Sequence, residues 1–248
     1  MTGERRVIVV TGAGGSLGGA ISRTLAGEEA TDLVLSDVSQ ASLDDTVRGL
    51  PEERGSIETI LADVSEFEQV QAVVTHALDR FGHLDAMIAN AGVISPNGRI
   101  HNLATEDWER AFRINVLGAV NAIKAAVAPM RAQGSGSIVL TASVSGLTAW
   151  SHAAPYCATK AAVIQLTKVG AVEYARDGIR VNCVCPGTFV SAIHEGLPAE
   201  AIETIAKRHP LGLGSADDLV GAYSYLVSDA SRWTTGSAMV VDGGYSAP

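Results

Sequence analysis

Short apolar runs alternate with longer stretches of helical periodicity along the whole chain. The runs occupy residues 6–11, 32–37, 57–63, 84–92, 136–143, 179–187 and 238–244. Most of them are continuous rather than alternating, as expected of strands that helices cover on both faces of a parallel sheet. Between the runs, the spacing of apolar residues predicts helices near 17–28, 40–49, 66–81, 105–131, 154–176 and 216–228.

This β-α-β-α order predicts an α/β fold with three layers, a doubly wound parallel sheet of about seven strands with helices on both faces. The chain has no internal repeat, low-complexity tract or linker, so we expect one domain over residues 1–248. Residues 188–215 are too long for an ordinary strand-to-helix connection. We expect them to carry a small helix and to form a lid over a ligand site.

Composition excludes several classes of protein. The 248 residues, 47% hydrophobic and 18% charged, are typical of a globular domain with a substantial core. The net charge of −9 is spread out, without the basic cluster that would bind nucleic acid or an anionic membrane. No apolar run approaches the roughly 18 residues that span a bilayer, and none resembles a secretory signal. We therefore expect a cytoplasmic protein.

Two of the three cysteines, Cys183 and Cys185, lie two residues apart in the run 179–187 and so point to one face of a strand. No further Cys or His stands near them at ligand spacing. Buried thiols are therefore expected, and no metal site.

The stretch TGAGGSLGG at 11–19 directly follows the first strand and opens the first helix. In open α/β sheets, ligands bind beyond the carboxyl ends of the strands, where helix N-termini offer free N–H groups and a positive dipole. Glycines let a pyrophosphate approach the backbone without meeting a Cβ. A glycine-rich turn that binds nothing is the alternative for this stretch taken alone.

Asp37, at the end of the second strand, supports a nucleotide site. A carboxylate there binds the hydroxyls of an adenosine ribose and repels the 2′-phosphate of NADP. No Lys or Arg in residues 11–22 or 33–47 offsets that repulsion. The sequence therefore favours NAD, with a solvated turn residue or a helix N-cap as the alternative for Asp37. Asp63, which ends the third strand, is expected to accept a hydrogen bond from the adenine amino group.

Further motifs resemble those of the short-chain dehydrogenases/reductases of the shorter, single-domain type, over nearly the whole chain. They are TGxxxGxG at 11–18 with Ser16 in place of a glycine, DV at 63–64, ANAG at 89–92 with Ala89 in place of Asn, INV at 114–116, ASVSG at 142–146, YCATK at 156–160, PG at 186–187 and VVDGG at 240–244. A lone Y-x-x-x-K is a weak signal. The same motif after Ser143, with all the others in order, is specific.

The resemblance implies a catalytic set of Asn115, Ser143, Tyr156 and Lys160. Tyr156 and Lys160 lie four residues apart in a predicted helix and so share a face. The Lys160 ammonium and a positive nicotinamide ring both favour the phenolate, so the pKa of Tyr156 is expected to fall from its ordinary value of about 10. Tyr156 then exchanges a proton with an alcohol or carbonyl oxygen, which Ser143 also binds. The resemblance further implies that Lys160 binds the nicotinamide ribose and that Asn115 holds a water linking Lys160 to solvent.

The residues expected to bind the cofactor lie at the predicted carboxyl ends of the strands. They are Gly12, Gly14, Ser16, Leu17, Gly18, Asp37, Val38, Asp63, Val64, Asn90, Ala91, Gly92, Tyr156, Lys160, Pro186, Gly187, Phe189 and Ser191. The Ser16 hydroxyl can donate to a phosphate or ribose oxygen. Phe189 is larger than the aliphatic residue that the family usually has, whereas Ser191 keeps the hydroxyl of the usual threonine. The sequence Asp-Gly-Gly at 242–244 is expected to be a structural turn.

The substrate pocket is expected to contain Ile94, Ser145, Trp150, His152 and residues of 188–210, a mostly apolar set that suits a neutral secondary alcohol or ketone. For His152 and His194, a surface or lid position is the preferred interpretation. Two other functions stay open. One is reduction of 3-oxoacyl thioesters on an acyl carrier protein, which Asp37 disfavours because such enzymes usually prefer NADPH. The other is a non-catalytic nucleotide-binding regulator, a class that usually lacks the tyrosine or the lysine.

The helices at 105–131 and 154–176 have more apolar positions than one face of a sheet needs. Small residues on them would let two helices approach closely, namely Ala119, Ala122, Ala126, Ala162 and Ala171. The resemblance implies that these helices pair across a two-fold axis, and that dimers join through the last strand and the tail. We expect a homotetramer, with coverage of both helices inside one chain as the alternative.

Overall fold

The computed structural model describes residues 5–52, 54–191 and 199–247. Seven strands form one sheet in the order β3-β2-β1-β4-β5-β6-β7, and every pairing is parallel. The strands are β1 (Arg6–Thr11), β2 (Thr31–Asp37), β3 (Ile57–Leu61), β4 (Ala86–Ala89), β5 (Gly136–Thr141), β6 (Ile179–Pro186) and β7 (Ala238–Val241). The predicted doubly wound sheet is confirmed.

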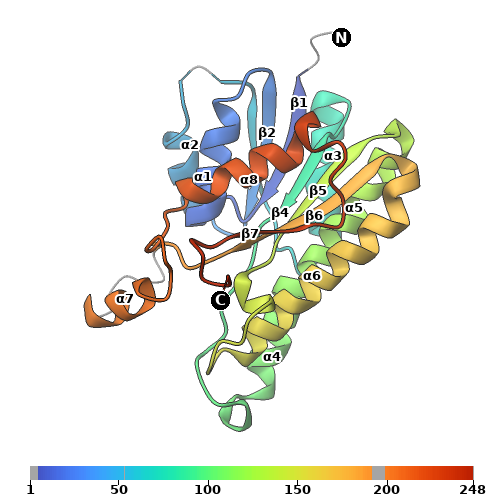
Figure 1. The fold of residues 1–248 in the computed structure, drawn as a ribbon. Helices are drawn as coiled ribbons and strands as arrows, with labels where there is room; N and C mark the ends of the chain where they lie inside the picture. The colour runs from blue at the N-terminus through green and yellow to red at the C-terminus, as the bar shows by residue number, and fades with distance from the viewer. Residues whose placement is uncertain (1–4, 53, 192–198, 248) are drawn as a thin grey trace.

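Helices cover both faces of the sheet (Figure 1). One layer holds α1 (Ser16–Ala26), α2 (Gln40–Arg48) and α8 (Asp217–Val227); the other holds α3 (Phe67–Phe81), α5 (Gly118–Gln133) and α6 (Ala154–Tyr174). The predicted helix at 105–131 is α4 (Thr105–Phe112), followed by a π-helical turn, Arg113–Leu117, and then α5. The small helix expected within 188–215 is α7 (Ala199–Ala206), which stands out near the carboxyl ends of the strands.

Strand β1 shows why its sequence is apolar without alternation. Val7 and Val9 pack into the core beneath α3 and α5, whereas Ile8 and Val10 pack into the core beneath α1 and α8. All four residues are fully buried. Because each face of β1 meets a helix layer, successive side chains must all be apolar.

Several predicted strands are shorter in the structure, and two of them differ most. The run 84–92 forms a strand only over Ala86–Ala89, and the run 238–244 only over Ala238–Val241. Beyond Val241 the Asp242 carboxylate accepts hydrogen bonds from the backbone N–H groups of Gly244 and Ser246, at 2.9 and 2.8 Å. The expected structural turn after the last strand is therefore present.

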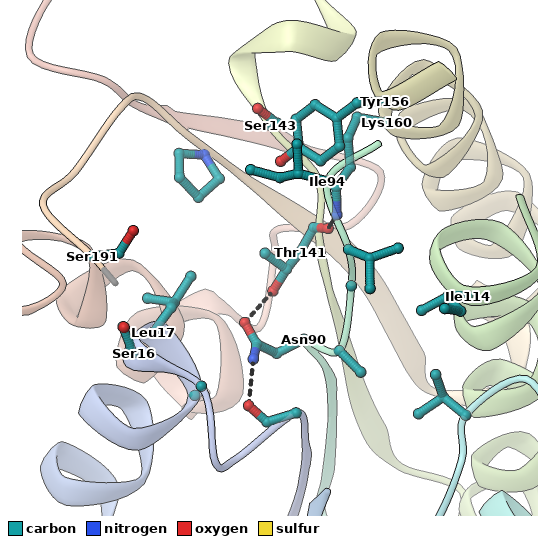
Figure 2. A pocket seen from close by; sticks show the side chains of 18 of the residues that line it. Ser16, Leu17, Asn90, Ile94, Ile114, Thr141, Ser143, Tyr156, Lys160 and Ser191 are labelled. Atoms are coloured by element: carbon teal, nitrogen blue, oxygen red, sulfur yellow. Dashed lines mark hydrogen bonds between the residues drawn. The ribbon is translucent and has the colours of Figure 1, made fainter. Parts of the chain in front are cut away.

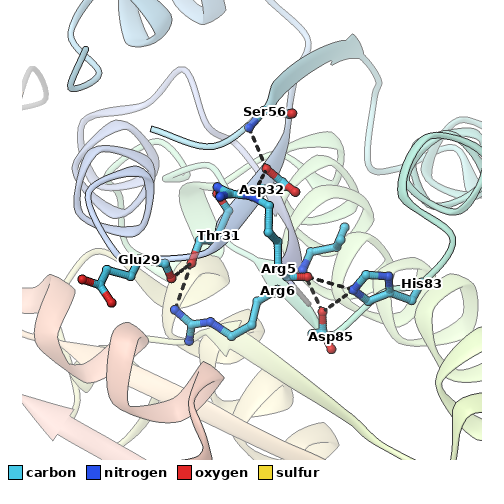
Figure 3. A network of polar contacts seen from close by, with 9 residues as sticks. Arg5, Arg6, Glu29, Thr31, Asp32, Ser56, His83 and Asp85 are labelled. Atoms are coloured by element: carbon cyan, nitrogen blue, oxygen red, sulfur yellow. Dashed lines mark hydrogen bonds and ion pairs between the residues drawn. The ribbon is translucent and has the colours of Figure 1, made fainter. Parts of the chain in front are cut away.

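A polar network joins the strands at the amino end of the sheet (Figure 3). Arg5 Nε lies 2.8 Å from Asp32 Oδ1, and the same oxygen accepts a 2.6 Å hydrogen bond from the Ser56 N–H. Asp85 Oδ2 accepts a 2.7 Å hydrogen bond from the Val7 N–H. These contacts pair polar groups at the amino ends of β1 and β2 with residues just before β1, β3 and β4. They hold the sheet together at the end opposite the glycine stretch.

The segment Thr105–Gln133 is long and apolar enough to cross a bilayer, but half of its most apolar window is buried inside the protein. Its small residues Ala119, Ala122 and Ala126, which the sequence predicts to contact a second chain, are instead buried in the core of one chain, as is Ala171 of α6. The segment is therefore a core helix of a soluble fold.

Cys183 and Cys185 are fully buried and free of disulfides, as the sequence predicts. In the part of the chain that the structure describes, no group of three or more His, Cys, Asp or Glu side chains is placed to hold a metal ion.

Candidate active site

A cavity of about 690 Å³ lies beyond the carboxyl ends of the strands. It lies where β1 has β2 on one side and β4 on the other, the point at which the winding of the sheet reverses and where such sheets bind ligands. All eighteen residues expected to bind the cofactor line this cavity, and so does Ser143. Figure 2 shows the cavity extending from Ser16 and Leu17 at one end to Ser143, Tyr156 and Lys160 at the other.

The glycine stretch leaves the N-terminus of α1 without a side-chain cap. Gly15 is the N-cap residue, and the first turn contains no acidic side chain. Gly12 turns the chain with a φ of +65°, a conformation that glycine adopts without strain. An uncapped helix N-terminus beside a cavity offers free N–H groups and a positive dipole end to an anion.

The glycines of this stretch have different roles. A Cβ at Gly18 would overlap the carbonyl oxygen of Gly12, so Gly18 allows α1 to pack on the loop. A Cβ at Gly14 would lie 3.0 Å from Asp37 Oδ2 and 2.5 Å from Ser42 Cβ. A Cβ at Gly15 would meet only Gly12 O, at 3.5 Å. Gly15 is therefore the glycine that protein packing does not require.

Asp37 is fixed by the backbone on both sides. Its Oδ2 accepts a 3.0 Å hydrogen bond from the Gly14 N–H, and its Oδ1 accepts a 3.1 Å bond from the Ser39 N–H. Ser39, not Asp37, is the N-cap of α2, because its side chain accepts from the Ser42 N–H. The N-cap alternative for Asp37 is therefore wrong. The carboxylate is held at the cavity wall beside the glycine loop.

Tyr156 and Lys160 extend from the first turns of α6 into the far end of the cavity. The Lys160 Nζ donates a 2.8 Å hydrogen bond to the Thr141 carbonyl oxygen at the end of β5 and lies 5.6 Å from the centre of the Tyr156 ring. The Ser143 side chain, just after β5, hydrogen-bonds Tyr156. The three groups therefore lie together although they come from two elements.

Burial dominates the ionisation of these side chains. It raises the pKa of Tyr156, which the Ser143 hydrogen bond lowers only in part. Burial also lowers the pKa of Lys160 from 10.5 to about 8. In the protein without a cofactor, the pKa of Tyr156 is therefore raised and not lowered as expected. The nearby lysine does not offset the loss of water around the phenol.

Asn115 is buried in the π-helical turn and does not line the cavity. Its Oδ1 accepts a 2.7 Å hydrogen bond from the Val93 N–H, and its Nδ2 donates to Val93 O at 2.9 Å and to Thr159 Oγ1 at 3.1 Å. The side chain thus ties the loop after β4 to α6. A Cβ at Gly92 would lie 3.2 Å from Asn115 Oδ1 and 3.4 Å from Lys160 Nζ, so the glycine leaves room for both groups.

Asn90 joins the glycine loop to β5. Its Nδ2 donates a 3.1 Å hydrogen bond to Gly12 O, and its Oδ1 accepts a 3.2 Å bond from Thr141 Oγ1 (Figure 2). The side chain therefore holds two walls of the cavity at a fixed separation.

Ile94, Trp150 and Phe189 line the cavity, as expected of the substrate pocket. Ser145 is buried and is not among the lining residues, so its placement in the pocket is wrong. His152 does not line the cavity either; it is exposed, as the preferred surface interpretation predicts. His194 and the rest of 192–198 lie outside the described residues. The lid role of residues 188–215 stays a prediction.

Several lining residues are not named among the expected site residues. They are Gly15, Ala62, Val93, Arg110, Ile114, Thr141, Ala142 and Thr188. Most lie in or next to a motif, and Thr188 begins the segment expected at the substrate pocket. Arg110 differs because it brings a cation from α4, and the only signal is its spacing of one helical turn before Ile114.

Comparisons with known proteins agree with this arrangement. A family model described as enoyl-(acyl carrier protein) reductase matches residues 12–246. The chain is 38% identical to cis-4-hydroxycyclohexanecarboxylate dehydrogenase of Sinomonas cyclohexanicum, over 98% of this chain and 97% of the relative. It is 34% identical to the 3-oxoacyl-(acyl-carrier-protein) reductase of Thermotoga maritima (97% and 98%) and 33% identical to cyclohexanol dehydrogenase of an Acinetobacter species (98% and 96%).

Two solved structures share the whole fold. One is a short-chain dehydrogenase/reductase from Burkholderia xenovorans, described as putative, with a TM-score of 0.93, 33% identity and coverage of 99% and 98% of the two chains. The other is an NAD⁺-bound xylitol dehydrogenase, with a TM-score of 0.89, 27% identity and coverage of 98% and 100%. The chain belongs to the short-chain dehydrogenase/reductase family. Within it, the chain is an oxidoreductase of the single-domain type.

Proposed function

We propose that this protein is an NAD-dependent oxidoreductase that interconverts a secondary alcohol and a ketone, with Tyr156 as the acid/base. One observation carries the proposal. A single cavity has an uncapped helix N-terminus and Asp37 at one end, and Ser143, Tyr156 and Lys160 at the other. A dinucleotide needs an anion site and a ribose acceptor, and alcohol chemistry needs a proton carrier.

The residues present fit a nicotinamide dinucleotide, which when bound accepts or supplies the hydride. The N–H groups at the start of α1 bind the pyrophosphate, and Asp37 binds the adenosine ribose hydroxyls. Ser143 and Tyr156 hold the substrate oxygen between them. Tyr156 accepts the hydroxyl proton during oxidation and donates a proton to the carbonyl oxygen during reduction. Lys160 binds the nicotinamide ribose and stabilises the phenolate.

The choice of NAD over NADP rests on Asp37. Its two carboxylate oxygens are held by the Gly14 and Ser39 N–H groups, so the negative charge cannot swing away from a 2′-phosphate. The likeness to a xylitol dehydrogenase with bound NAD⁺ supports this choice.

The substrate is a neutral, mainly apolar secondary alcohol or the corresponding ketone, because the apolar side chains of Ile94, Trp150 and Phe189 in the cavity wall suit a hydrocarbon group. The names of two relatives, a hydroxycyclohexanecarboxylate dehydrogenase and a cyclohexanol dehydrogenase, support a cyclic substrate. We place the enzyme in the cytoplasm.

The test is a panel of secondary alcohols, cyclic and open-chain, with and without a carboxylate, assayed with NAD⁺ and NADP⁺. Oxidation of cyclic alcohols with NAD⁺ is expected. Turnover confined to 3-oxoacyl thioesters with NADPH would favour the carrier-protein reductase instead. Tight NADH binding without turnover of any alcohol or ketone would favour a non-catalytic regulator.

We also propose a homotetramer. Apolar side chains remain exposed in one chain along α4, the π-helical turn and α6, at Phe112, Leu117, Val169 and Val172. Val240 on the edge strand β7 and Trp233 just before it are exposed as well. Closed two-fold contacts on both surfaces would remove them from water.

A further inference from the structure

The indole of Trp150 forms part of the cavity wall and has an aromatic neighbour on two sides. Its ring centroid lies 6.3 Å from that of Tyr156 and 6.2 Å from that of Tyr245, with an edge-on angle of 77° to the second ring. The indole Nε1 is buried and has no hydrogen-bond partner among the described residues. Packing alone therefore orients this ring.

Tyr245 is itself firmly held, although it lies close to the end of the chain. Its ring stacks on His209 with centroids 4.8 Å apart, and the Arg208 guanidinium lies 5.4 Å from its centre. The turn that carries it is closed by Asp242 and is linked to the segment before α8 by a 3.0 Å hydrogen bond from Leu211 N–H to Gly243 O. The tail is thus fixed to the chain that follows α7.

His209 continues the connection back to the cavity. It is 3% exposed, and its Nε2 accepts a 3.1 Å hydrogen bond from the Thr188 N–H, while its Nδ1 lies 3.0 Å from Ile205 O and donates to it. Thr188 lines the cavity, as do Trp150 and Tyr156. The contacts therefore link Tyr156 to Thr188 through Trp150, Tyr245 and His209. Together they form one side of the cavity at the end that holds Tyr156.

We infer that Tyr245 is a positioning residue that sets substrate selectivity, because its ring fixes the orientation of Trp150 in the pocket wall. This inference rests on the proposed function, since it concerns the substrate of that same site. Aromatic pairs of this geometry add stabilisation beyond their buried area. Without the Tyr245 ring, Trp150 keeps one aromatic neighbour of two and turns into the space that Tyr245 occupied. The pocket then becomes larger and less defined.

The first measurement reads the position of Trp150 without any substrate. In a Trp108→Phe/Trp233→Phe background, Trp150 is the only tryptophan. Adding Tyr245→Ala is expected to shift its emission to longer wavelength and to raise its acrylamide quenching constant by about twofold, because a tilted indole meets water. Tyr245→Phe keeps the ring and is expected to change neither quantity. Tyr245→Leu keeps apolar volume without a flat ring and serves if the alanine variant fails to fold.

The second measurement is selectivity between cyclohexanol and 4-tert-butylcyclohexanol with NAD⁺. In Tyr245→Ala the ratio of kcat/KM for the bulky over the small alcohol is expected to rise about tenfold, with KM for cyclohexanol rising more than kcat falls. The NADH dissociation constant should not change. An unchanged quenching constant in Tyr245→Ala would overturn the inference, and so would altered fluorescence with an unchanged ratio. If no variant oxidises any alcohol, the proposed function fails, while the fluorescence still reports whether Tyr245 positions Trp150.

Discussion

The Lys160 Nζ lies 5.6 Å from the centre of the Tyr156 ring while it donates a 2.8 Å hydrogen bond to the Thr141 carbonyl oxygen. The main chain of β5 therefore holds the ammonium in place, and Tyr156 does not. Because both side chains are buried, each is in an environment that disfavours its charged form. The lysine charge therefore lies where burial makes it costly, beside the phenol that ionises in the proposed mechanism.

Tyr156→Phe removes only the ionisable hydroxyl. We expect kcat to fall by at least about 100-fold, because acid–base catalysis contributes roughly 10²–10⁴-fold. NADH affinity, measured by fluorescence titration, should change little. Tyr174→Phe, at the other end of the same helix, is the matched control and should retain full activity. Near-normal turnover of Tyr156→Phe would refute the mechanism.

Lys160→Met is expected to abolish most activity and yet to stabilise the fold at pH 7. The native pKa of Lys160 is about 8 against 10.5 for an ordinary lysine, which corresponds to a penalty of about 3 kcal/mol. The variant removes this penalty but also loses the hydrogen bond to Thr141, which costs about 1 kcal/mol of unfolding free energy. Urea unfolding at pH 7 should therefore show a variant more stable by about 1–3 kcal/mol.

The difference in unfolding free energy between Lys160→Met and the wild type should change with pH in one direction only. Below pH 8 both the native and the unfolded wild type carry the lysine proton, so the penalty is constant. Between pH 8 and 10.5 the unfolded chain holds a proton that the native state has lost, so wild-type stability rises with pH relative to the variant. The stability advantage of Lys160→Met over the wild type should therefore shrink between pH 8 and 10.5. Lys168→Met, an exposed position on the same helix, should show no such trend; a gap independent of pH would contradict the argument.

Asp37→Ala is expected to lower the ratio of kcat/KM for NAD⁺ over NADP⁺ by at least about tenfold, because it removes the charge that repels a 2′-phosphate. Asp37→Asn separates charge from geometry, since its side-chain oxygen can still accept the Gly14 N–H. If charge decides the preference, both variants lose it. A wild type that uses NADP⁺ better than NAD⁺ would show that this interpretation of Asp37 is wrong.

Gly15→Ala and Gly18→Ala form a pair with opposite expected effects. At Gly18 a Cβ overlaps Gly12 O, so the variant should lose about 1–3 kcal/mol of unfolding free energy. At Gly15 the nearest atom to a Cβ is Gly12 O at 3.5 Å, so the protein should keep its stability and lose NADH affinity instead. Thermal unfolding and NADH titration measure both quantities. Equal melting temperatures for the two variants would be evidence against this division of roles.

Light scattering at micromolar concentration is expected to give a mass near four times that of one chain, because the tetramer buries the exposed apolar residues. Val172→Glu on α6 should reduce this mass, since it places a charge in the proposed helix contact. Glu173→Ala, its exposed neighbour in sequence, is the control. A wild-type mass equal to one chain would refute oligomerisation, and a dimer would leave only one of the two surfaces as an interface.

Much of the fold could be predicted because its causes are local. The run Val7–Val10 is apolar at every position because each face of β1 meets a helix layer. Most cavity residues follow from motifs at strand ends, since parallel strands bring their carboxyl ends together. The ring contact between Trp150 and Tyr245 has no local pattern, because it joins residues far apart in the chain. The direction of the Tyr156 pKa shift depends on burial, which only tertiary packing determines.

The strand order also bears on how the chain is made. From β1 the sheet grows to one side through β2 and β3, and then to the other side through β4, β5, β6 and β7. During synthesis from the N-terminus, each strand after β1 therefore finds its partner already made. The wall beside Trp150 forms later still, because Tyr245 follows β7 in the chain and packs against Trp150 from there. The nucleotide half of the cavity, built by β1, β2 and the start of α1, can therefore fold before the substrate half is complete.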